Sequence, residues 1–257
     1  MSDALIDALG ARAGIVCAVG AGGKKSTLYR VLDTHPGRVG LTATAMTTPP
    51  PSRYLDTRLF ADADALVQTV PRAAATHRRV GFACPSEKSG RCAGLPPARV
   101  AEIHEAAGFE VTLVKADGAR MRGIKAPRSD EPLIVPGTRT VIFVVSAAVI
   151  GQPLGERIAH RVPELTQLLG LTPGDTVCAE HVGHLLSDPA GAAQHIGQAT
   201  LIGLINQVDG DAQRTLARQA AQRAMAGACP PARVVLSAMT ASEPLVDVVE
   251  SARNAAD

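Results

Sequence analysis

The feature that most constrains the fold is a glycine-rich segment between an apolar strand and a helix. Residues 15–19 read Ile-Val-Cys-Ala-Val, typical of a buried strand, and a helical pattern covers 26–32. Glycines between them let successive backbone N–H groups point at one anion, and the helix start adds the positive end of its dipole. We therefore predict a phosphate-binding turn with lysines that neutralise the anion. Its residues are Gly20, Ala21, Gly22, Gly23, Lys24, Lys25, Ser26 and Thr27.

Two registers fit the common P-loop pattern, and neither fits it fully. If Lys24 binds the phosphate, Lys25 occupies the usual Ser/Thr position, and Ser26 or Thr27 has to ligate Mg²⁺. If Lys25 binds the phosphate, Ser26 follows correctly but Lys24 replaces a glycine. The compact Gly-x-x-Gly-Lys spacing resembles that of Mur-type ligases and favours Lys24. The alternative is an ordinary glycine-rich turn between a strand and a helix.

The rest of the chain alternates strand-like and helical segments. Strands are expected over 15–19, 39–42, 79–84, 110–115, 140–146, 200–205 and 233–237. Helices are expected over 1–13, 26–32, 62–75, 97–108, 163–170, 175–186 and 212–226. This alternation predicts an α/β, P-loop NTPase-like fold with a mostly parallel, doubly wound sheet. Residues 150–199 lack strand signals, so we expect a single domain over 1–257 with a helical insertion there.

Composition and charge exclude several classes of protein. Aromatic residues make up 2% of the chain and the net charge is +2, whereas nucleic-acid binders usually carry a basic stripe with stacking aromatics. The five cysteines are scattered without a Cys-x-x-Cys pair, which is typical of free thiols in a reducing compartment. The longest apolar run, 141–151, is too short to span a bilayer. We expect a cytoplasmic protein without nucleic-acid or membrane partners.

An aspartate directly follows another expected strand. Residues 111–114 lead to Lys115-Ala116-Asp117-Gly118, and P-loop proteins place their metal-organising acid at such a strand end. We therefore expect Asp117 and Ser26 to ligate Mg²⁺. The basic residues of the following loop are candidates for contact with a second anionic group: Arg120, Arg122 and Lys125. The alternative is that Asp117 is a turn residue followed by solvated charges.

Two further strand ends resemble the base-reading elements of GTPases. Asn206-Gln207-Val208-Asp209 follows one expected strand, and Ser237-Ala238 ends another. In GTPases the aspartate accepts hydrogen bonds from the guanine edge and the Ser-Ala backbone contacts O6, so this order predicts GTP in preference to ATP. Here Gln207 replaces the usual lysine. The alternative is that Asn206 and Asp209 close the strand as turn residues.

Together these motifs resemble the YqeC family. The matching pieces, in family order, are Gly20-Ala21-Gly22-Gly23-Lys24, Thr42 to Pro49, Ala116-Asp117-Gly118-Ala119, Lys125-Ala126-Pro127, Glu131-Pro132, His160-Arg161 with Pro163-Glu164, and Asn206-Gln207-Val208-Asp209. The chain departs from the family at Lys115, where Glu is usual, and at Lys25, where Thr or Ser is usual. The resemblance makes Asp117, His160 and Arg161 catalytic candidates. The alternative for the His-Arg pair is capping a helix or pairing with Glu164.

The resemblance implies an accessory protein of selenium-dependent molybdenum hydroxylases. The leading hypothesis is a nucleotide-dependent maturation factor whose partner is a molybdenum-containing hydroxylase or its maturation machinery, with nucleoside triphosphate hydrolysis as an open question. Its cofactors would be GTP or ATP and Mg²⁺, with a molybdopterin-type cofactor as a further ligand. Two alternatives stay open. One is a transferase or ligase that uses a nucleoside triphosphate on a small acid, and the other is a non-hydrolysing carrier of a phosphorylated pterin.

Overall fold

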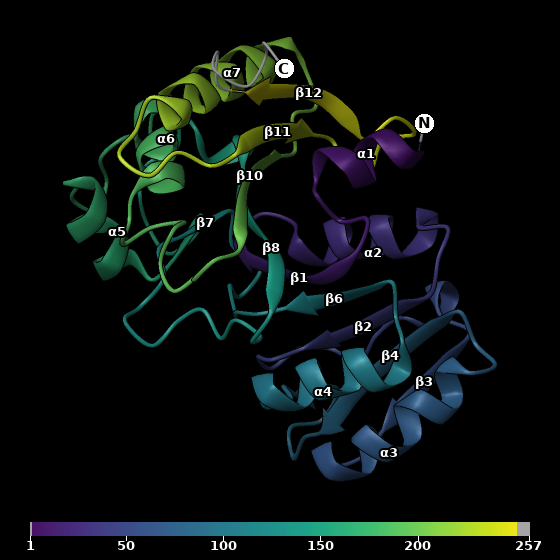
Figure 1. Ribbon diagram of the computed structural model, residues 1–257. Coiled ribbons are helices and arrows are strands. Elements are labelled where there is room, and N and C mark those ends of the chain that lie inside the picture. The colour runs from purple at the N-terminus through teal and green to yellow at the C-terminus, as the bar shows by residue number, and fades with distance from the viewer. Residues whose placement is uncertain (1, 251–257) are drawn as a thin grey trace. The chain divides into compact units, whose positions relative to one another are not determined.

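The computed structural model describes residues 2–250 and shows an α/β chain with a mostly parallel, mixed sheet (Figure 1). The chain forms two compact units. Unit 1 comprises Met1–Ala18, Thr27–Gly118 and Leu133–Val141, and unit 2 comprises Val19–Ser26, Ala119–Pro132 and Ile142–Asp257. Within residues 2–250, no helix is long and apolar enough to cross a membrane.

Unit 1 is built on parallel strands in the order β1-β6-β2-β4-β3. Their bounds are β1 Gly14–Gly20, whose last residues belong to unit 2, β6 Val111–Lys115, β2 Val39–Ala43, β4 Arg79–Pro85 and β3 Thr57–Phe60. A short strand, β5 Cys92–Ala93, pairs antiparallel with β4. Both β2 and the first five residues of β1 pair with β6, and these central strands are almost wholly buried apolar residues, as expected for parallel strands covered on both faces.

Helices lie on both sides of these strands. Their bounds are α1 Ser2–Ala8, α2 Lys24–Thr34, α3 Ala63–Ala74 and α4 Pro97–Ala107, with a 3₁₀ turn, η1, at Ser52–Tyr54. Figure 1 shows α2 on one side of β1, β6 and β2, and α3 and α4 packed together on the other. Helix α4 begins with a proline and ends at Gly108, whose φ of 60° suits a residue without a Cβ.

Unit 2 contains the second half of β8, and its strands follow the order β8-β10-β11-β12. The bounds are β8 Thr138–Ser146, β10 Thr200–Asn206, β11 Arg233–Ser237 and β12 Leu245–Glu250. Strands β10 and β11 are parallel and β12 is antiparallel to β11. A separate small sheet pairs β7 Ile124–Lys125 in parallel with β9 Ala159–His160.

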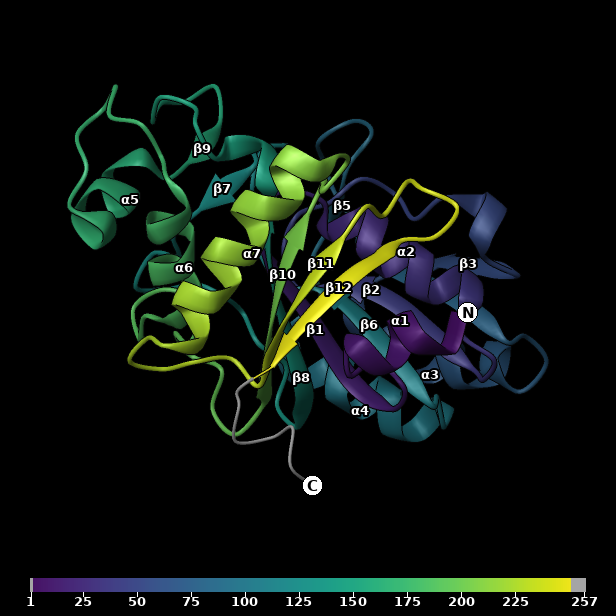
Figure 2. The ribbon, with the colours of Figure 1, turned by 90° about the horizontal axis from the view of Figure 1, so that it is seen from above.

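The helices of unit 2 are α5 Val162–Leu169, α6 Ala179–Ser187 and α7 Asp211–Met225, with a 3₁₀ turn, η2, at Ala147–Val149. Helix α7 runs along β10, β11 and β12 and packs against α6 (Figure 2). The close approach uses small residues. A Cβ on Gly183 of α6 would stand 2.7 Å from the carbonyl oxygen of Ala220 in α7, so a larger residue would push the two helices apart.

Several elements differ from the sequence expectations. The first helix stops at Ala8, because the chain turns at Gly10 with φ 60°. Helix α2 begins at Lys24 rather than at 26, so the glycine turn is shorter than expected. Helix α6 begins after Cys178, because the Asp175 carboxylate accepts hydrogen bonds from Thr172 N and Oγ1 and closes a turn there. The short strands β3, β5, β7 and β9 and the edge strand β12 were not expected, since each lacks a long apolar pattern.

Candidate functional site

The glycine turn joins the end of β1 to the start of α2. The φ angles are 82° at Gly20, 92° at Gly22 and 133° at Gly23, a range that residues with a Cβ rarely adopt. There is also no room for one. A Cβ on Gly22 would collide with the backbone nitrogen of Ser146, and one on Gly23 with the side-chain amide of Asn206. Glycine is therefore required at these positions by both conformation and packing.

Two backbone amides of the turn hold it in place. Ala21 N donates to the carbonyl of Val144 at 2.8 Å, and Gly22 N donates to the carbonyl of Arg122 at 2.9 Å. These bonds position the turn against β8 and against the segment that leads into β7. The anion contacts predicted for the turn and for the first turn of α2 stay a prediction.

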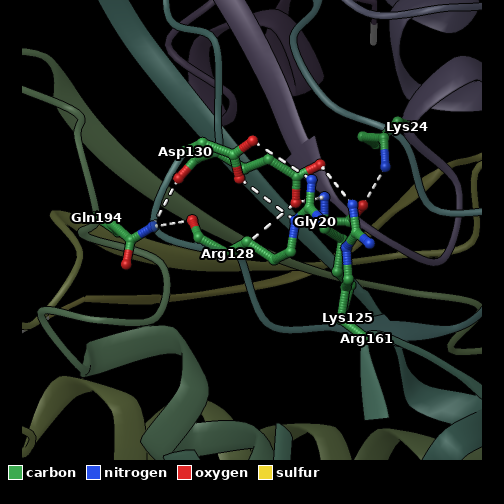
Figure 3. A network of polar contacts seen from close by, with 8 residues as sticks. Gly20, Lys24, Lys125, Arg128, Asp130, Arg161 and Gln194 are labelled. Atoms are coloured by element: carbon green, nitrogen blue, oxygen red, sulfur yellow. Dashed lines mark hydrogen bonds and ion pairs between the residues drawn. The ribbon is translucent and has the colours of Figure 1, made fainter. Parts of the chain in front are cut away.

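Lys24 is the lysine that folds back over the turn. Its side chain is buried, and its Nζ donates to the carbonyl of Gly20 (Figure 3). Lys25 is half-buried. Of the two hydroxyls considered for the metal, Thr27 is buried and Ser26 is exposed. The structure thus places one lysine across the turn and one serine at the surface beside it.

Asn206, at the end of β10, ties three segments of unit 2 together. Its Nδ2 donates to the carbonyl of Gly22 at 2.8 Å. Its Oδ1 accepts from Ser237 Oγ at 3.1 Å and from Met239 N at 3.2 Å. Asn206 is only 4% exposed, the two bonds to its Oδ1 are buried, and the bond to Gly22 O is partly buried. Asn206 therefore links the glycine turn to the turn that follows β11.

The other residues of the GTPase-like pair of strand ends surround this link. Gln207 has a φ of 64°, and its Oε1 accepts a hydrogen bond from Ser146 Oγ. Val208 N donates to the carbonyl of Ser237 at 3.0 Å, and Ala238 N donates to that of Pro244 at 2.9 Å. Asp209 is exposed. The structure brings Asn206, Ser237 and the glycine turn together and leaves Asp209 facing solvent.

Asp117 lies in unit 1, directly after β6. Its side chain is 3% exposed. The backbone around it is fixed by Ala116 N, which donates to Ala18 O at 3.0 Å, and by Ala116 O, which accepts from Leu133 N at 3.2 Å. Ser26 belongs to unit 2, so a metal site shared by Asp117 and Ser26 stays a prediction. Over residues 2–250, no group of three or more His, Cys, Asp and Glu side chains is placed to hold a metal ion.

A set of charged residues that we term the Lys125 cluster lies next to the glycine turn in unit 2. Its members are Arg120, Lys125, Glu131, His160 and Arg161. The Lys125 Nζ is 2.9 Å from Glu131 Oε2, and Arg161 Nη2 is 3.3 Å from Glu131 Oε1. Lys125 and His160 are register partners in the β7–β9 sheet. Because Gly22 N donates a hydrogen bond to the carbonyl of Arg122, the β7–β9 sheet begins beside the glycine turn (Figure 3).

The cluster shifts the pKa of two of its members. Burial alone raises the pKa of Glu131, but the hydrogen bonds and positive charges of Lys125 and Arg161 outweigh burial and bring it below its ordinary value. The pKa of His160 is lowered, first by burial and then by the positive charges of Arg161, Lys125 and Arg120, with Glu131 opposing. Glu131 is therefore ionised and His160 neutral near neutral pH.

A loop that sequence reasoning did not single out supports the Lys125 cluster. Gln194 Nε2 donates to the carbonyls of Arg128 and Glu131, both at 2.6 Å, and Figure 3 shows this side chain beside Arg128 and Asp130. His195 Nε2 lies 2.8 Å from the carbonyl of Ser129. Glu131-Pro132 was one of the motif pieces, but nothing in the sequence marked the carboxylate as the partner of Lys125 and Arg161.

Backbone strain in non-glycine residues gathers in unit 2. Positive φ angles occur at Arg120 (45°), Met121 (60°), Arg161 (70°), His195 (56°) and Gln207 (64°). Each such residue costs about 1–3 kcal/mol and persists only where its surroundings hold it. Among these residues, Arg120 and Arg161 belong to the Lys125 cluster, Gln207 follows Asn206, and His195 contacts the carbonyl of Ser129. Part of the strain therefore coincides with the Lys125 cluster and with the Asn206 link.

Comparison with known proteins settles the family. A family model described as YqeC protein matches residues 16–163. The chain belongs to the YqeC family. A protein of Escherichia coli (strain K12) named Uncharacterized protein YqeC is 30% identical over 202 residues, which are 76% of this chain and 77% of that protein. The YqeC match includes the glycine turn, Asp117 and the Lys125 cluster, whereas Asn206 and Asp209 lie beyond it.

Proposed function

We propose that this YqeC-family protein binds a nucleoside triphosphate at the glycine turn, with GTP favoured over ATP, through a P-loop-like fold. The proposal includes the role of an accessory factor in the maturation of a molybdenum-containing hydroxylase. The nucleotide is supported by the geometry of the turn. The accessory role rests on the family resemblance alone.

The observation that carries the nucleotide proposal is the Asn206 link. A glycine turn by itself is a common connection between a strand and a helix. Here a buried asparagine holds that turn, through Gly22 O, to the Ser237–Met239 segment. The segments assigned to phosphate and to base are thus joined within one unit. A fixed turn is also what phosphate binding requires, because preorganised N–H groups do not have to be ordered when the ligand arrives.

The phosphate contacts follow from charge and from the helix start. The α2 helix begins at Lys24, so its positive dipole end and the amides of its first turn lie at the turn. In the structure the Lys24 ammonium donates to Gly20 O, and a phosphate oxygen is a stronger acceptor for it because both partners are charged. Binding would therefore exchange a carbonyl contact for a charge-assisted one.

The base contacts are assigned to the end of β10 and the turn after β11. Asp209 is exposed and has a carboxylate that can accept from the two donors of the guanine edge. Asn206 makes its three side-chain hydrogen bonds within the protein, so its part is to position the loop. Ser237 and Ala238 provide backbone groups at the neighbouring strand end.

The residues assigned to Mg²⁺ carry donor atoms of the kind that this ion prefers. The Ser26 hydroxyl and the Asp117 carboxylate are the hard oxygen ligands that Mg²⁺ prefers. When bound, the ion would neutralise charge on the phosphates. His160 and Arg161 are assigned the role of stabilising negative charge on the phosphoryl group. Arg161 is held in position by Glu131, with 3.3 Å between Arg161 Nη2 and Glu131 Oε1.

An NTP-dependent transferase acting on a small acid is the second candidate. It is favoured by the Lys125 cluster, which gathers cations next to the turn and could orient an anionic acceptor. The third candidate, a carrier of a phosphorylated pterin, would use the same turn for the pterin phosphate. Phosphate release separates the three: release by the protein alone indicates an NTPase, release only with an added acceptor indicates a transferase, and binding of the pterin without release indicates a carrier.

The proposal is tested by equilibrium titration of the purified full-length protein with GTP and ATP in the presence of Mg²⁺. Saturable binding that is lost in Lys24→Ala supports it. If neither nucleotide binds the wild-type protein at millimolar concentration, the nucleotide proposal is wrong. The accessory role is tested separately, by measuring the activity of the molybdenum hydroxylase in cells that lack this protein.

A further inference from the structure

Strand β3 stands last in the strand order of unit 1, so one of its edges has no neighbouring strand within residues 2–250 (Figure 1). In a parallel sheet, alternate residues of a strand bond to its two neighbours. The first residue of β2 donates to the carbonyl of Arg78, so the even-numbered residues of β4 face β2 and the odd-numbered ones face β3. The register of β3 against β4 then assigns the bonds to β4 to Thr57 and Leu59. The backbone N–H and C=O groups of Arg58 and Phe60 consequently lie at the open edge.

The two residues at the open edge also have the more exposed side chains. Arg58 is exposed and Phe60 is 46% exposed, whereas Thr57 and Leu59 are half-buried. The guanidinium carbon of Arg58 lies 5.9 Å from the centre of the Phe60 ring, and Arg58 Nη1 donates to the carbonyl of Pro50 at 3.1 Å. These contacts hold the cation beside the ring. The edge therefore presents backbone hydrogen-bonding groups, a positive charge and an aromatic surface together.

A second pair of an arginine and an aromatic ring lies in η1, shortly before β3 in the chain. The guanidinium carbon of Arg53 is 4.6 Å from the centre of the Tyr54 ring, and that ring is 5.6 Å from the ring of Tyr29 on α2. Arg53 is exposed and Tyr54 is half-buried. Aromatic residues make up only 2% of the chain, yet two arginine–aromatic pairs occur in this one segment. Arginine and aromatic side chains are the types enriched at the centres of protein interfaces.

The charge of this segment is not neutralised from within. Over residues 2–250, no ion pair joins Arg53 or Arg58 to a carboxylate. Asp56, the acid between them in the sequence, instead accepts hydrogen bonds from the backbone nitrogens of Arg78 and Arg79, both at 2.9 Å. The segment can therefore pair with carboxylates of a ligand, and hydrogen bonds between arginine and carboxylate are among the stronger ones in proteins.

From this arrangement we infer that the β3 edge, which we define as β3 with Arg53 and Tyr54, is a docking site for an extended acidic segment of a partner protein. The segment adds to β3 as a further strand and bonds to the backbone of Arg58 and Phe60. Its carboxylates pair with the two arginines, and an apolar side chain packs on Phe60. The inference does not rest on the proposed nucleotide site.

A second copy of this chain is a poorer occupant of the β3 edge. Pairing two β3 strands would place the arginines of both copies on one short ribbon, where like charges repel. An acidic segment has the opposite charge and so gains from the same arginines. Charge therefore selects the acidic partner over self-association.

The test uses a fluorescently labelled peptide of about eight alternating glutamate and valine residues, whose binding to the full-length protein is followed by anisotropy at low salt. Saturable binding below about 1 mM is expected. Arg58→Gln removes a charge-assisted hydrogen bond and should weaken binding about tenfold, and Phe60→Ala should weaken it several-fold. The matched control is Arg214→Gln, which removes an exposed arginine from α7 in unit 2 and should leave the affinity unchanged.

Amide hydrogen exchange followed by NMR distinguishes strand addition from charge attraction alone. The peptide should protect the N–H groups of Arg58 and Phe60, whereas those of Thr57 and Leu59 already face β4. A fully N-methylated form of the peptide keeps the charge but lacks the N–H donors, so it should bind at least about tenfold more weakly.

The inference is overturned if the glutamate–valine peptide does not bind at millimolar concentration, the result expected if Arg58 only protects the edge from pairing. It is equally overturned if a lysine–valine peptide or the N-methylated peptide binds as tightly, if Arg58→Gln leaves the affinity unchanged, or if the Arg58 and Phe60 amides stay unprotected. A dimer of the protein that the peptide dissociates would assign the edge to a second copy. A single-stranded oligonucleotide that binds more tightly than the peptide, and loses affinity in Arg58→Gln, would assign it to nucleic acid.

Discussion

Removal of the Asn206 side chain tests the link between the glycine turn and the far strand ends. Asn206→Ala deletes three hydrogen bonds, of which those with Ser237 Oγ and Met239 N are buried and the one to Gly22 O is partly buried. A hydrogen bond contributes about 0.5–1.5 kcal/mol net, and a buried group left without a partner costs about 1–3 kcal/mol. The free energy of unfolding should therefore fall by about 2–4 kcal/mol. For a chain of this size that corresponds to a decrease in Tm of about 4–16 °C.

The measurement is urea unfolding followed by circular dichroism, with thermal melts alongside. The matched control is Gln219→Ala, which truncates an exposed amide side chain on α7 and should change stability by less than about 0.5 kcal/mol. Asn206→Asp refines the test, because it keeps the acceptor for Ser237 and Met239 but faces Gly22 O with a second acceptor. If Asn206→Ala stays within about 0.5 kcal/mol of the wild-type protein, the link does not stabilise the site and the reasoning fails.

The remaining predictions concern binding, metal dependence and pH. Lys24→Ala should abolish nucleotide binding and leave the fold intact, and Lys25→Ala should cost less; the reverse order in a titration would show that Lys25 is the phosphate lysine. Asp117→Asn should weaken Mg²⁺-dependent affinity or turnover more than metal-free binding, whereas an equal loss with and without Mg²⁺ would make Asp117 a structural residue. GTP should bind at least about tenfold more tightly than ATP, since adenine lacks the donor pair that guanine offers to the Asp209 carboxylate and a hydrogen bond to a charged group is worth about 1.5–3 kcal/mol. Asp209→Asn should shift the preference toward XTP in a competition titration, and equal GTP and ATP affinities in the wild-type protein would refute base reading. Because the pKa of His160 is lowered by burial and by nearby cations, the unfolded chain binds its proton first as the pH falls through the ordinary histidine value of about 6.5, so this group destabilises the folded protein in acid. Between pH 7.5 and 5.5, the free energy of unfolding measured in urea should fall less for His160→Gln than for the wild-type protein. If the two proteins lose stability in parallel, this prediction is refuted.

Much of the fold could be predicted from the sequence because its signals are local. The strand before the glycine turn, the turn itself and the helix after it occupy a few consecutive residues, and each follows from backbone freedom and apolar patterning. The same holds for α4, with a proline at its start and Gly108 at its end. The short strand β5 and the edge strand β12 could not be predicted in this way. Strand β5 is stabilised by pairing with β4, and β12 by pairing with β11, and neither by an apolar pattern of its own.

The same distinction between local sequence signals and tertiary contacts applies to the candidate site. The sequence by itself determined which residue types could hold a phosphate: glycines where φ has to be positive, a lysine at the helix start, and polar residues at strand ends. The tertiary structure decided which of them meet. Asn206 reaches Gly22 across 184 residues of chain, and Arg161 reaches Glu131 across 30. The partner of a buried polar group depends on which strand ends the sheet aligns, as when β10 and β11 bring Asn206 into register with Ser237. That alignment is a property of the packed core, and no short stretch of sequence contains it.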